Sequence, residues 1–186
     1  SVAYLAGALL VEVHAAGLPL SATVHDIEPK VIRPKGQSTT CPRDGRLGAA
    51  FVDCVSQLDG AGMSTHMLSY TWGYEVDTIT DGLLDFCGSS RLDPQRAIFW
   101  ICCFCINQHR VQEAQERGEA VPFVQFKVEF GERVTSIGHL VALMSPWSDP
   151  LYTKRVWCNF EMFTAVSLGD LCKLSVTMPP ADADDM

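Results

Sequence analysis

Glu161 is the residue whose type and surroundings point most clearly to chemistry. It lies in an apolar run between Phe160 and Met162. The four positions that could reach it along a helix hold uncharged residues: Trp157, Cys158, Thr164 and Ala165. A carboxylate in such surroundings either finds a partner elsewhere in the fold or keeps a raised pKa in an apolar cleft. A carboxyl group with a raised pKa is the kind that acid–base and glycosidic-bond chemistry uses.

A purely structural role for Glu161 is the alternative. Buried carboxylates also occur in structural ion-pair networks. Arg110 or Arg133 could supply the cation here, or a loop backbone could supply hydrogen bonds. The residues by themselves leave both interpretations open.

A second group of potentially reactive residues is Cys102, Cys103, Cys105 and His109. They could be taken for a metal cluster, but the group holds no Cys-x-x-Cys pair and its cysteines lie in an apolar run. A nucleophilic cysteine working with His109 or His139 is likewise not supported by either spacing. The sequence therefore favours a buried core segment here, and it predicts neither a metal site nor a bound cofactor.

Short apolar runs that alternate with helix-like stretches from Ser64 onward predict a parallel sheet covered on both faces. Four strands are expected, at His66–Tyr70, Ala97–Ile106, His139–Met144 and Leu171–Met178. The second run is apolar at every position, which predicts a central strand buried on both sides.

Helices are expected between these strands. Helical spacing joins two sets of apolar residues: Val76, Ile79, Leu83 and Cys87, and then Phe123, Phe126, Phe130, Val134 and Ile137. The second set also alternates like a strand, but a parallel sheet needs a crossover there. A third helix is expected over Leu151–Leu168, before the last strand.

Residues 1–62 are expected to form an N-terminal arm ahead of an α/β domain at 63–186. The pattern predicts a helix over Val2–Ala16, an irregular stretch over Pro29–Gly48 and a second helix over Ala49–Leu58. No residue of the arm suggests a chemical role.

Composition limits the classes of function. The 186 residues are 47% hydrophobic, which is enough for one globular domain with a full core. The net charge of −8 argues against nucleic acid as a partner. The apolar run Val2–Val11 is too short to span a membrane. Eight cysteines without a regular disulfide pattern indicate reduced thiols and an intracellular, cytoplasmic location.

Three motifs resemble known families. Leu68-Ser-Tyr-Thr-Trp-Gly73 follows the first expected strand, and Trp157-Cys-Asn-Phe-Glu161 lies in the last expected helix. This order and the Trp-Cys-x-x-Glu pattern are similar to plant-type Toll/interleukin-1 receptor (TIR) domains. The first motif and Cys105-Ile-Asn-Gln108 also resemble the related fungal heterokaryon-incompatibility (HET) domain. The resemblance covers residues 64–180.

The resemblance implies a flavodoxin-like, three-layer α/β fold and a set of site residues. In TIR domains that hydrolyse NAD, the motif Glu is the catalytic carboxylate, which here is Glu161. Trp157 lies one helical turn earlier and could line the same face, although a plain core aromatic is the alternative. The other expected substrate-binding residues follow the first strand: Ser69, Trp72, Tyr74 and Asp77.

Two functions are therefore expected from the sequence. The first is an intracellular signalling or defence domain that hydrolyses the nicotinamide–ribose bond of NAD or a related nucleotide. The second is a non-catalytic module that associates with itself or with other TIR-like domains. The chain departs from the family in three ways. The 69–74 loop holds no basic residue, and the segment after His109 is long and polar through Glu119. A fifth strand and last helix are missing, which predicts a domain truncated at its C-terminus.

Overall fold

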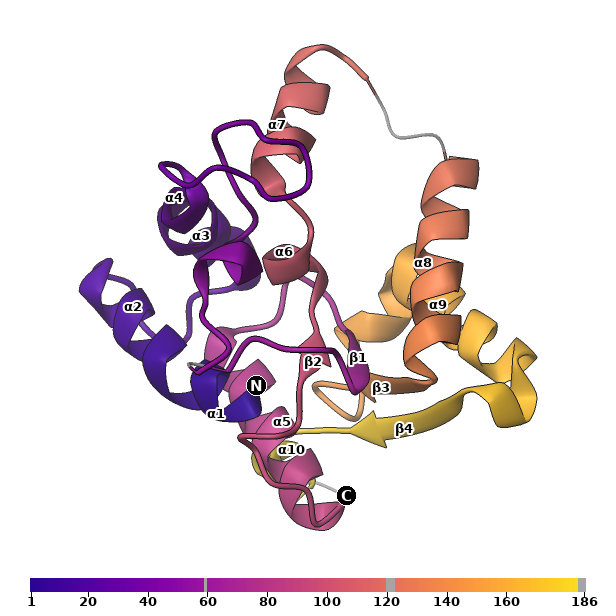
Figure 1. Cartoon of the computed structure of the whole chain (residues 1–186). Coiled ribbons are helices and arrows are strands. Elements are labelled where there is room, and N and C mark those ends of the chain that lie inside the picture. Colours follow the sequence, from indigo (N-terminus) through magenta and orange to yellow (C-terminus); the bar gives the residue numbers. More distant parts are fainter. Residues whose placement is uncertain (59, 120–122, 184–186) are drawn as a thin grey trace.

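The protein is built on a four-stranded parallel sheet with the strand order β2-β1-β3-β4. The computed structural model describes residues 1–58, 60–119 and 123–183. The strands are β1 (His66–Ser69), β2 (Phe99–Trp100), β3 (His139–Leu143) and β4 (Lys173–Thr177). The α/β class with a parallel sheet and a helical N-terminal region, predicted from the sequence, is confirmed (Figure 1).

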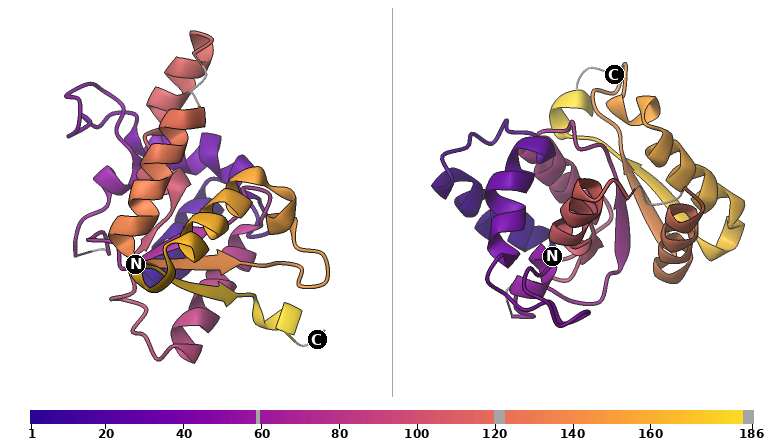
Figure 2. Two further views of the ribbon diagram at one scale, coloured as in Figure 1. Left: turned by 90° about the vertical axis from the view of Figure 1, so that its right-hand side faces the viewer. Right: turned by 90° about the horizontal axis from the view of Figure 1, so that it is seen from above.

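Helices cover both faces of the sheet. On one face, α8 (Phe123–Ile137) and α9 (Val156–Ser167) pack against β1 and β3, while α5 (Val76–Ser89) packs against β4 on the other. Two views at right angles show the sheet between these layers (Figure 2). The remaining short helices after the N-terminal region are α6 (Cys102–Cys105), α7 (Gln108–Glu116), η4 (Leu151–Lys154), η5 (Gly169–Leu171) and α10 (Pro180–Ala183).

The N-terminal residues form two continuous helical segments. The first runs through α1 (Val2–Tyr4), η1 (Leu5–Leu9) and α2 (Leu10–Ala15), and the second through α3 (Val24–Ile27), η2 (Glu28–Ile32) and α4 (Arg33–Gly36). The predicted first helix is confirmed. The expectation of irregular chain from Pro29 is wrong up to Gly36, because buried apolar residues at helical spacing, Val24, Ile27 and Val31, continue the helix past Pro29.

Two other helices differ in extent from the sequence prediction. Only a 3₁₀ turn, η3 (Phe51–Cys54), forms within residues 49–58, since the Asp53 carboxylate accepts the backbone N–H of Ala50 and Val55 is extended. The last helix begins at Val156 rather than at residue 151, because Arg155 is extended (φ −109°, ψ 119°) after the separate turn η4.

The predicted strand over Ala97–Ile106 is wrong in length and in position. Only Phe99 and Trp100 pair with β1, and β2 lies at the edge of the sheet. The chain then turns into α6, because an unbroken apolar run suits a buried helical turn as well as a strand. The run is apolar throughout because the N-terminal region covers this edge: the backbone N–H of Val2 donates to Ala97 O at 3.0 Å.

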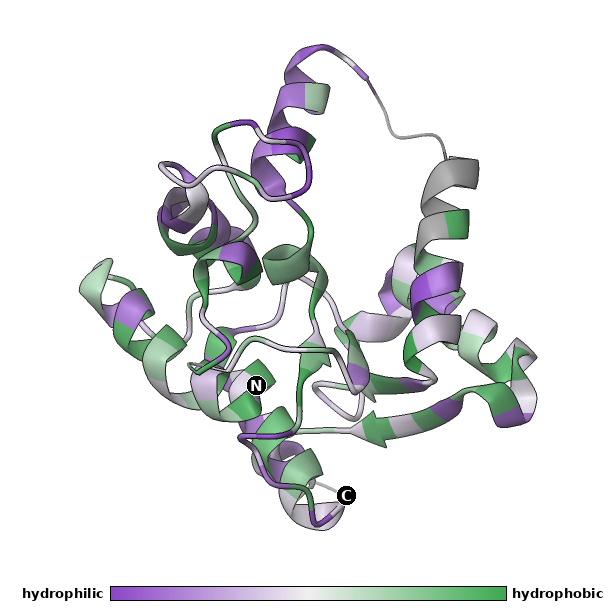
Figure 3. Ribbon diagram, viewed as in Figure 1, coloured by the Kyte–Doolittle hydropathy of each residue, from purple (hydrophilic) through white to green (hydrophobic). Residues whose placement is uncertain are grey.

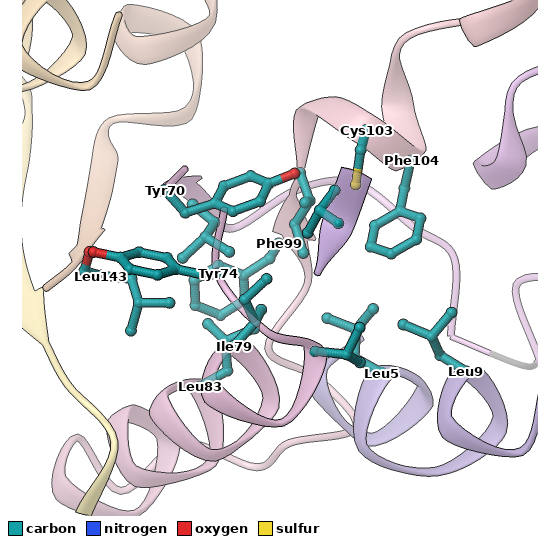
Figure 4. Packing of buried hydrophobic residues seen from close by; sticks show 14 of the residues in the cluster. Leu5, Leu9, Tyr70, Tyr74, Ile79, Leu83, Phe99, Cys103, Phe104 and Leu143 are labelled. Atoms are coloured by element: carbon teal, nitrogen blue, oxygen red, sulfur yellow. The ribbon is translucent and has the colours of Figure 1, made fainter. Parts of the chain in front are cut away.

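Two buried clusters hold the layers together. The larger lies between the sheet, α5 and the N-terminal helices, and the smaller joins the sheet to α8 and α9. Figure 4 shows Leu5 and Leu9 of the N-terminal helix beside Ile79 of α5 and Phe104 of α6. Hydrophobic colour follows the strands, whereas α7 is mostly hydrophilic (Figure 3).

The N-terminal region is also tied to the loop after β1. The backbone N–H of Val24 donates to Tyr74 O at 3.2 Å, and that of His25 donates to Trp72 O at 3.3 Å. Residues 1–54 therefore share a core and hydrogen bonds with the rest of the chain. The division into an arm and an α/β domain stays a prediction. None of the helices described is long and apolar enough to cross a membrane.

Two histidines pack against one another at the start of the sheet. The His66 and His139 rings are 4.6 Å apart, and His66 stacks on Phe99 at 4.9 Å. Burial lowers the pKa of His139 from 6.5 to about 4, with further contributions from His66 and Lys173. The fold therefore favours the neutral imidazole.

We expect burial of His139 against His66 to lower the free energy of unfolding in acid. The unfolded chain takes up a proton near pH 6.5 and the folded chain only near 4, so wild-type stability falls as pH drops through this window. The variant His139→Gln should lose that component in urea unfolding followed across the same range, whereas His14→Gln, at an exposed position, should keep it. A pH-independent difference between wild type and His139→Gln would contradict the assignment.

Candidate active site

The candidate site is centred on Glu161, in the middle of α9. Its side chain is only 7% exposed and is hydrogen-bonded to Ser69, the last residue of β1, so the carboxyl group lies at the carboxyl edge of the sheet. Among the side chains that the structure describes, no Lys or Arg forms an ion pair with Glu161. Burial raises the pKa of Glu161 from 4.5 to about 7, with a hydrogen bond from Ser69 acting in the opposite direction. The carboxyl group is therefore poised to change charge near neutral pH.

Ser69 and Tyr152 hold the Glu161 carboxyl from behind. Ser69 ends β1 and its hydroxyl donates to Glu161 Oε2 when the carboxyl is ionised. The Tyr152 hydroxyl lies 2.7 Å from Ser69 Oγ and donates to Cys158 O at 2.9 Å. Ser69 and Tyr152 are both 0% exposed, so this arrangement excludes solvent.

Tyr74 fixes the loop that carries Tyr152. The Tyr74 hydroxyl donates to Leu143 O at 3.1 Å and accepts the backbone N–H groups of Ser145 (3.0 Å) and Tyr152 (3.2 Å). Figure 4 shows its hydroxyl end at Leu143. A residue of the loop after β1 therefore positions the loop after β3, although the two lie about seventy residues apart in the chain.

The exposed side of Glu161 opens onto a cavity of about 410 Å³. The carboxyl ends of parallel strands are where open α/β sheets bind ligands, and this cavity lies there. It is lined by His25, Tyr70, Thr71, Trp72, Cys102, Ile106, Gln108, Val111, Gln115, Phe130, Arg155, Trp157, Cys158 and Glu161.

One wall of the cavity is aromatic and comes from three separate segments. Trp72 contacts the His25 ring edge-on with 5.5 Å between centroids, and its indole N–H donates to Cys102 Sγ at 3.4 Å. The Cys102 thiol in turn donates to the Tyr70 hydroxyl at 3.5 Å. Flat, apolar surfaces of this kind suit a planar heterocycle.

Arg155 provides positive charge at the same cavity. It is the only Lys or Arg among the described residues that line it, its side chain is exposed, and none of the ion pairs described involves it. Gln108 and Gln115, from α7, contribute neutral polar groups to the lining. The cavity thus combines aromatic walls, one acid and one cation.

The structure brings together part of the predicted site. Glu161, Trp72 and Trp157 line the cavity, and Ser69 lies behind Glu161. Tyr74 is buried and binds the backbone instead, and Asp77 lies in the first turn of α5, outside the cavity lining. The roles of these residues in binding stay predictions.

Several residues of the site were not expected from the sequence. His25 comes from a region in which no chemical role was recognised, and Arg155 and Tyr152 precede α9 without belonging to any motif. Their placement depends on contacts between distant segments, so no local pattern marks them. Gln108 is the exception, since it ends the Cys105-Ile-Asn-Gln108 motif.

The competing interpretations have less support. Arg110, one suggested partner of Glu161, instead pairs with Asp44 at 2.6 Å and Glu113 at 2.8 Å. Burial raises the pKa of the Cys102 thiol to about 11, which disfavours a reactive thiolate. In the part of the chain that the structure describes, all eight cysteines are free and no group of His, Cys, Asp and Glu is arranged to hold a metal ion.

Comparison with known proteins gives no relative for this chain. No protein-family model, no curated protein and no solved structure matches it. The inferences about function therefore depend on the geometry of the site and on the resemblance of its motifs.

Burial of Glu161 should make stability depend on pH in a defined direction. The pKa of Glu161 in the folded protein, about 7, exceeds the ordinary value of 4.5. The contribution of Glu161 to the free energy of unfolding is therefore complete below pH 4.5, and roughly 3 kcal/mol of it is lost as the pH rises through 7. Glu161→Gln should remove this loss in urea unfolding at acidic and mildly alkaline pH. If the stability difference between wild type and the variant is the same at both, the carboxyl is not held neutral.

Proposed function

We propose that this chain is a TIR/HET-like signalling or defence domain that hydrolyses the nicotinamide–ribose bond of NAD or a related nucleotide. The observation that carries the proposal is the Glu161 carboxyl, which lines a 410 Å³ cavity and has no cation partner among the described side chains. The TIR-like Trp-Cys-x-x-Glu motif supports it, because Trp157 and Glu161 line the same cavity.

The chemistry required of Glu161 is that of an ionised carboxylate. The bond between ribose C1′ and the nicotinamide nitrogen breaks, its electron pair goes to the nitrogen, and neutral nicotinamide leaves. The sugar then carries an oxocarbenium-like charge, which an adjacent carboxylate stabilises in a water-poor site. Water adds to C1′ and loses a proton to solvent, so Glu161 is unchanged at the end of the cycle.

The remaining lining fits a nucleotide. Trp72 and Trp157 offer aromatic surface to a base or a nicotinamide ring. Arg155 supplies a guanidinium, the group best suited to a phosphate. Arg155 lies six positions before Glu161, immediately before the first residue of α9, so the two backbone positions are separated by roughly 9 Å along the helix axis.

Removing the carboxylate should abolish hydrolysis. We expect Glu161→Gln to release nicotinamide from NAD on the order of 100-fold more slowly than wild type at high protein concentration. Glu75→Gln is the matched control, because Glu75 is exposed and outside the cavity lining. Nicotinamide release by folded Glu161→Gln at the wild-type rate would exclude this mechanism.

Arg155 should discriminate phosphorylated from unphosphorylated ligands. We expect Arg155→Ala to weaken binding of nicotinamide mononucleotide by about tenfold and to leave nicotinamide riboside unaffected, since only the former carries a phosphate. Lys154→Ala is the control: Lys154 is the neighbouring cation, but it pairs with Asp149 at 2.6 Å. Quenching of tryptophan fluorescence, measured in the Glu161→Gln background so that neither ligand is hydrolysed, would report binding, and equal weakening of both ligands would refute the assignment.

A non-catalytic association module is the second candidate. Exposed apolar side chains on α9, on η5 and on the edge strand β4 favour it: Phe163 (69% exposed), Val166 (62%), Leu171 (71%) and Val176 (49%). Such side chains are typical of protein–protein contacts. If neither wild type nor Glu161→Gln releases nicotinamide, while sedimentation shows self-association that Phe163→Glu abolishes, this candidate replaces the enzyme.

A further inference from the structure

Three successive oxygen–oxygen contacts form an unbroken hydrogen-bond chain behind Glu161. The Glu161 carboxyl is hydrogen-bonded to Ser69 Oγ, Ser69 Oγ lies 2.7 Å from the Tyr152 hydroxyl, and that hydroxyl lies 2.9 Å from Cys158 O. Each of these distances requires a shared proton, because two oxygen lone pairs repel at such range. Ser69 and Tyr152 are both 0% exposed, so no solvent reaches the contact between their hydroxyls to supply a missing proton.

The number of protons decides which state of Glu161 the chain fits. With Glu161 ionised, only the hydroxyls of Ser69 and Tyr152 carry protons, so two protons serve three contacts and one contact is left without a hydrogen bond. With Glu161 neutral, the carboxyl donates to Ser69, Ser69 donates to Tyr152 and Tyr152 donates to Cys158 O. Every contact is then a hydrogen bond.

We propose that Tyr152 is a positioning residue that keeps Glu161 protonated while the cavity is empty, because the chain from Glu161 through Ser69 to Cys158 O is complete only with that proton in place. A neutral carboxyl explains how Glu161 is buried without a cation partner among the described side chains. Tyr152 acts through Ser69 and does not line the cavity.

The other titratable groups around Glu161 do not oppose this state. On the sheet and α6 side, burial raises the pKa values of Tyr70 and of Cys102, the latter to about 11. On α9, burial raises the pKa of Cys158 to about 12, and burial also raises that of Tyr152. These groups are neutral near pH 7, and Arg155 and His25 lie at exposed positions of the cavity lining.

A cationic ligand would reverse the preference. If the proposed function holds, the nicotinamide ring of NAD brings a positive charge into the cavity beside Glu161, and an opposite charge at short range favours the carboxylate. Glu161 then releases its proton to solvent through the cavity, and the Ser69 hydroxyl donates to the carboxylate. The acid would thus become a charged catalyst only when substrate is present, and the empty cavity would not contain an isolated charge.

The test is a direct titration of Glu161 in the free protein by carboxyl ¹³C NMR. Tyr152→Phe removes the acceptor that Ser69 needs when Glu161 is neutral, so we expect the Glu161 midpoint to fall by about one pH unit, a tenfold change that one hydrogen bond accounts for. Tyr70→Phe is the matched control and should leave the Glu161 midpoint unchanged. It also removes a buried tyrosine hydroxyl, but that hydroxyl is bonded to Cys102 and not to Ser69 or Glu161. An unchanged or higher midpoint in Tyr152→Phe would overturn the proposal.

A measurement on wild-type protein keeps the proposal testable if Tyr152→Phe does not fold. The Tyr152 hydroxyl must change hydrogen-bond partners when Glu161 loses its proton, so the ¹³Cζ resonance of Tyr152 should titrate with the midpoint of Glu161. A Tyr152 resonance that does not respond to that titration would contradict the chain. Neither titration needs turnover, so the two proposals can fail separately. A lowered Glu161 midpoint in Tyr152→Phe without nicotinamide release by wild type would refute the enzyme and support the hydrogen-bond chain. Nicotinamide release with an unchanged midpoint would support the enzyme and refute the hydrogen-bond chain.

Discussion

The burial of one carboxyl group without a cation is the constraint on which the site depends. Moving an isolated carboxylate out of water is costly, and the usual remedies are an arginine partner or access to solvent. Glu161 has little solvent access and no cation partner among the described side chains, and Ser69 and Tyr152 hold its inner side. The end of β1, the turn before α9 and α9 itself must therefore keep their relative positions for the carboxyl to remain satisfied.

The topology of the sheet brings together the loops that surround Glu161. In a parallel sheet the loops that follow the strands gather at one edge. The order β2-β1-β3-β4 puts β1 beside β3, so the loops after these two strands meet, and Tyr74 ties one to the other. The same edge receives His25 from the N-terminal helices, which are attached to the 70–75 loop by backbone hydrogen bonds. The cavity is consequently built from segments that span most of the chain.

Two buried titratable groups, His139 and Glu161, make the stability of the fold depend on pH in opposite directions. Burial favours neutral His139 and neutral Glu161, so acid destabilises the fold through the first group and alkali through the second. His139 lies at the start of its strand and Glu161 near the carboxyl edge of the sheet. Glu161 also lines the cavity of about 410 Å³, so the cost of burying an ionisable group coincides there with room for a ligand.

The sequence by itself determined the α/β class, the approximate positions of β1, β3 and β4, the helices α5 and α8, and the isolation of Glu161 from cations along its own helix. These follow from local periodicity, which records which faces are buried. Tertiary structure alone decided that the Ala97–Ile106 run is an edge strand followed by a helical turn, since apolar character does not distinguish a central strand from an edge covered by other segments. It also decided that Tyr152 joins Ser69 and Glu161 and that Arg155 and His25 share their cavity, because these contacts link segments whose spacing in the chain carries no signal.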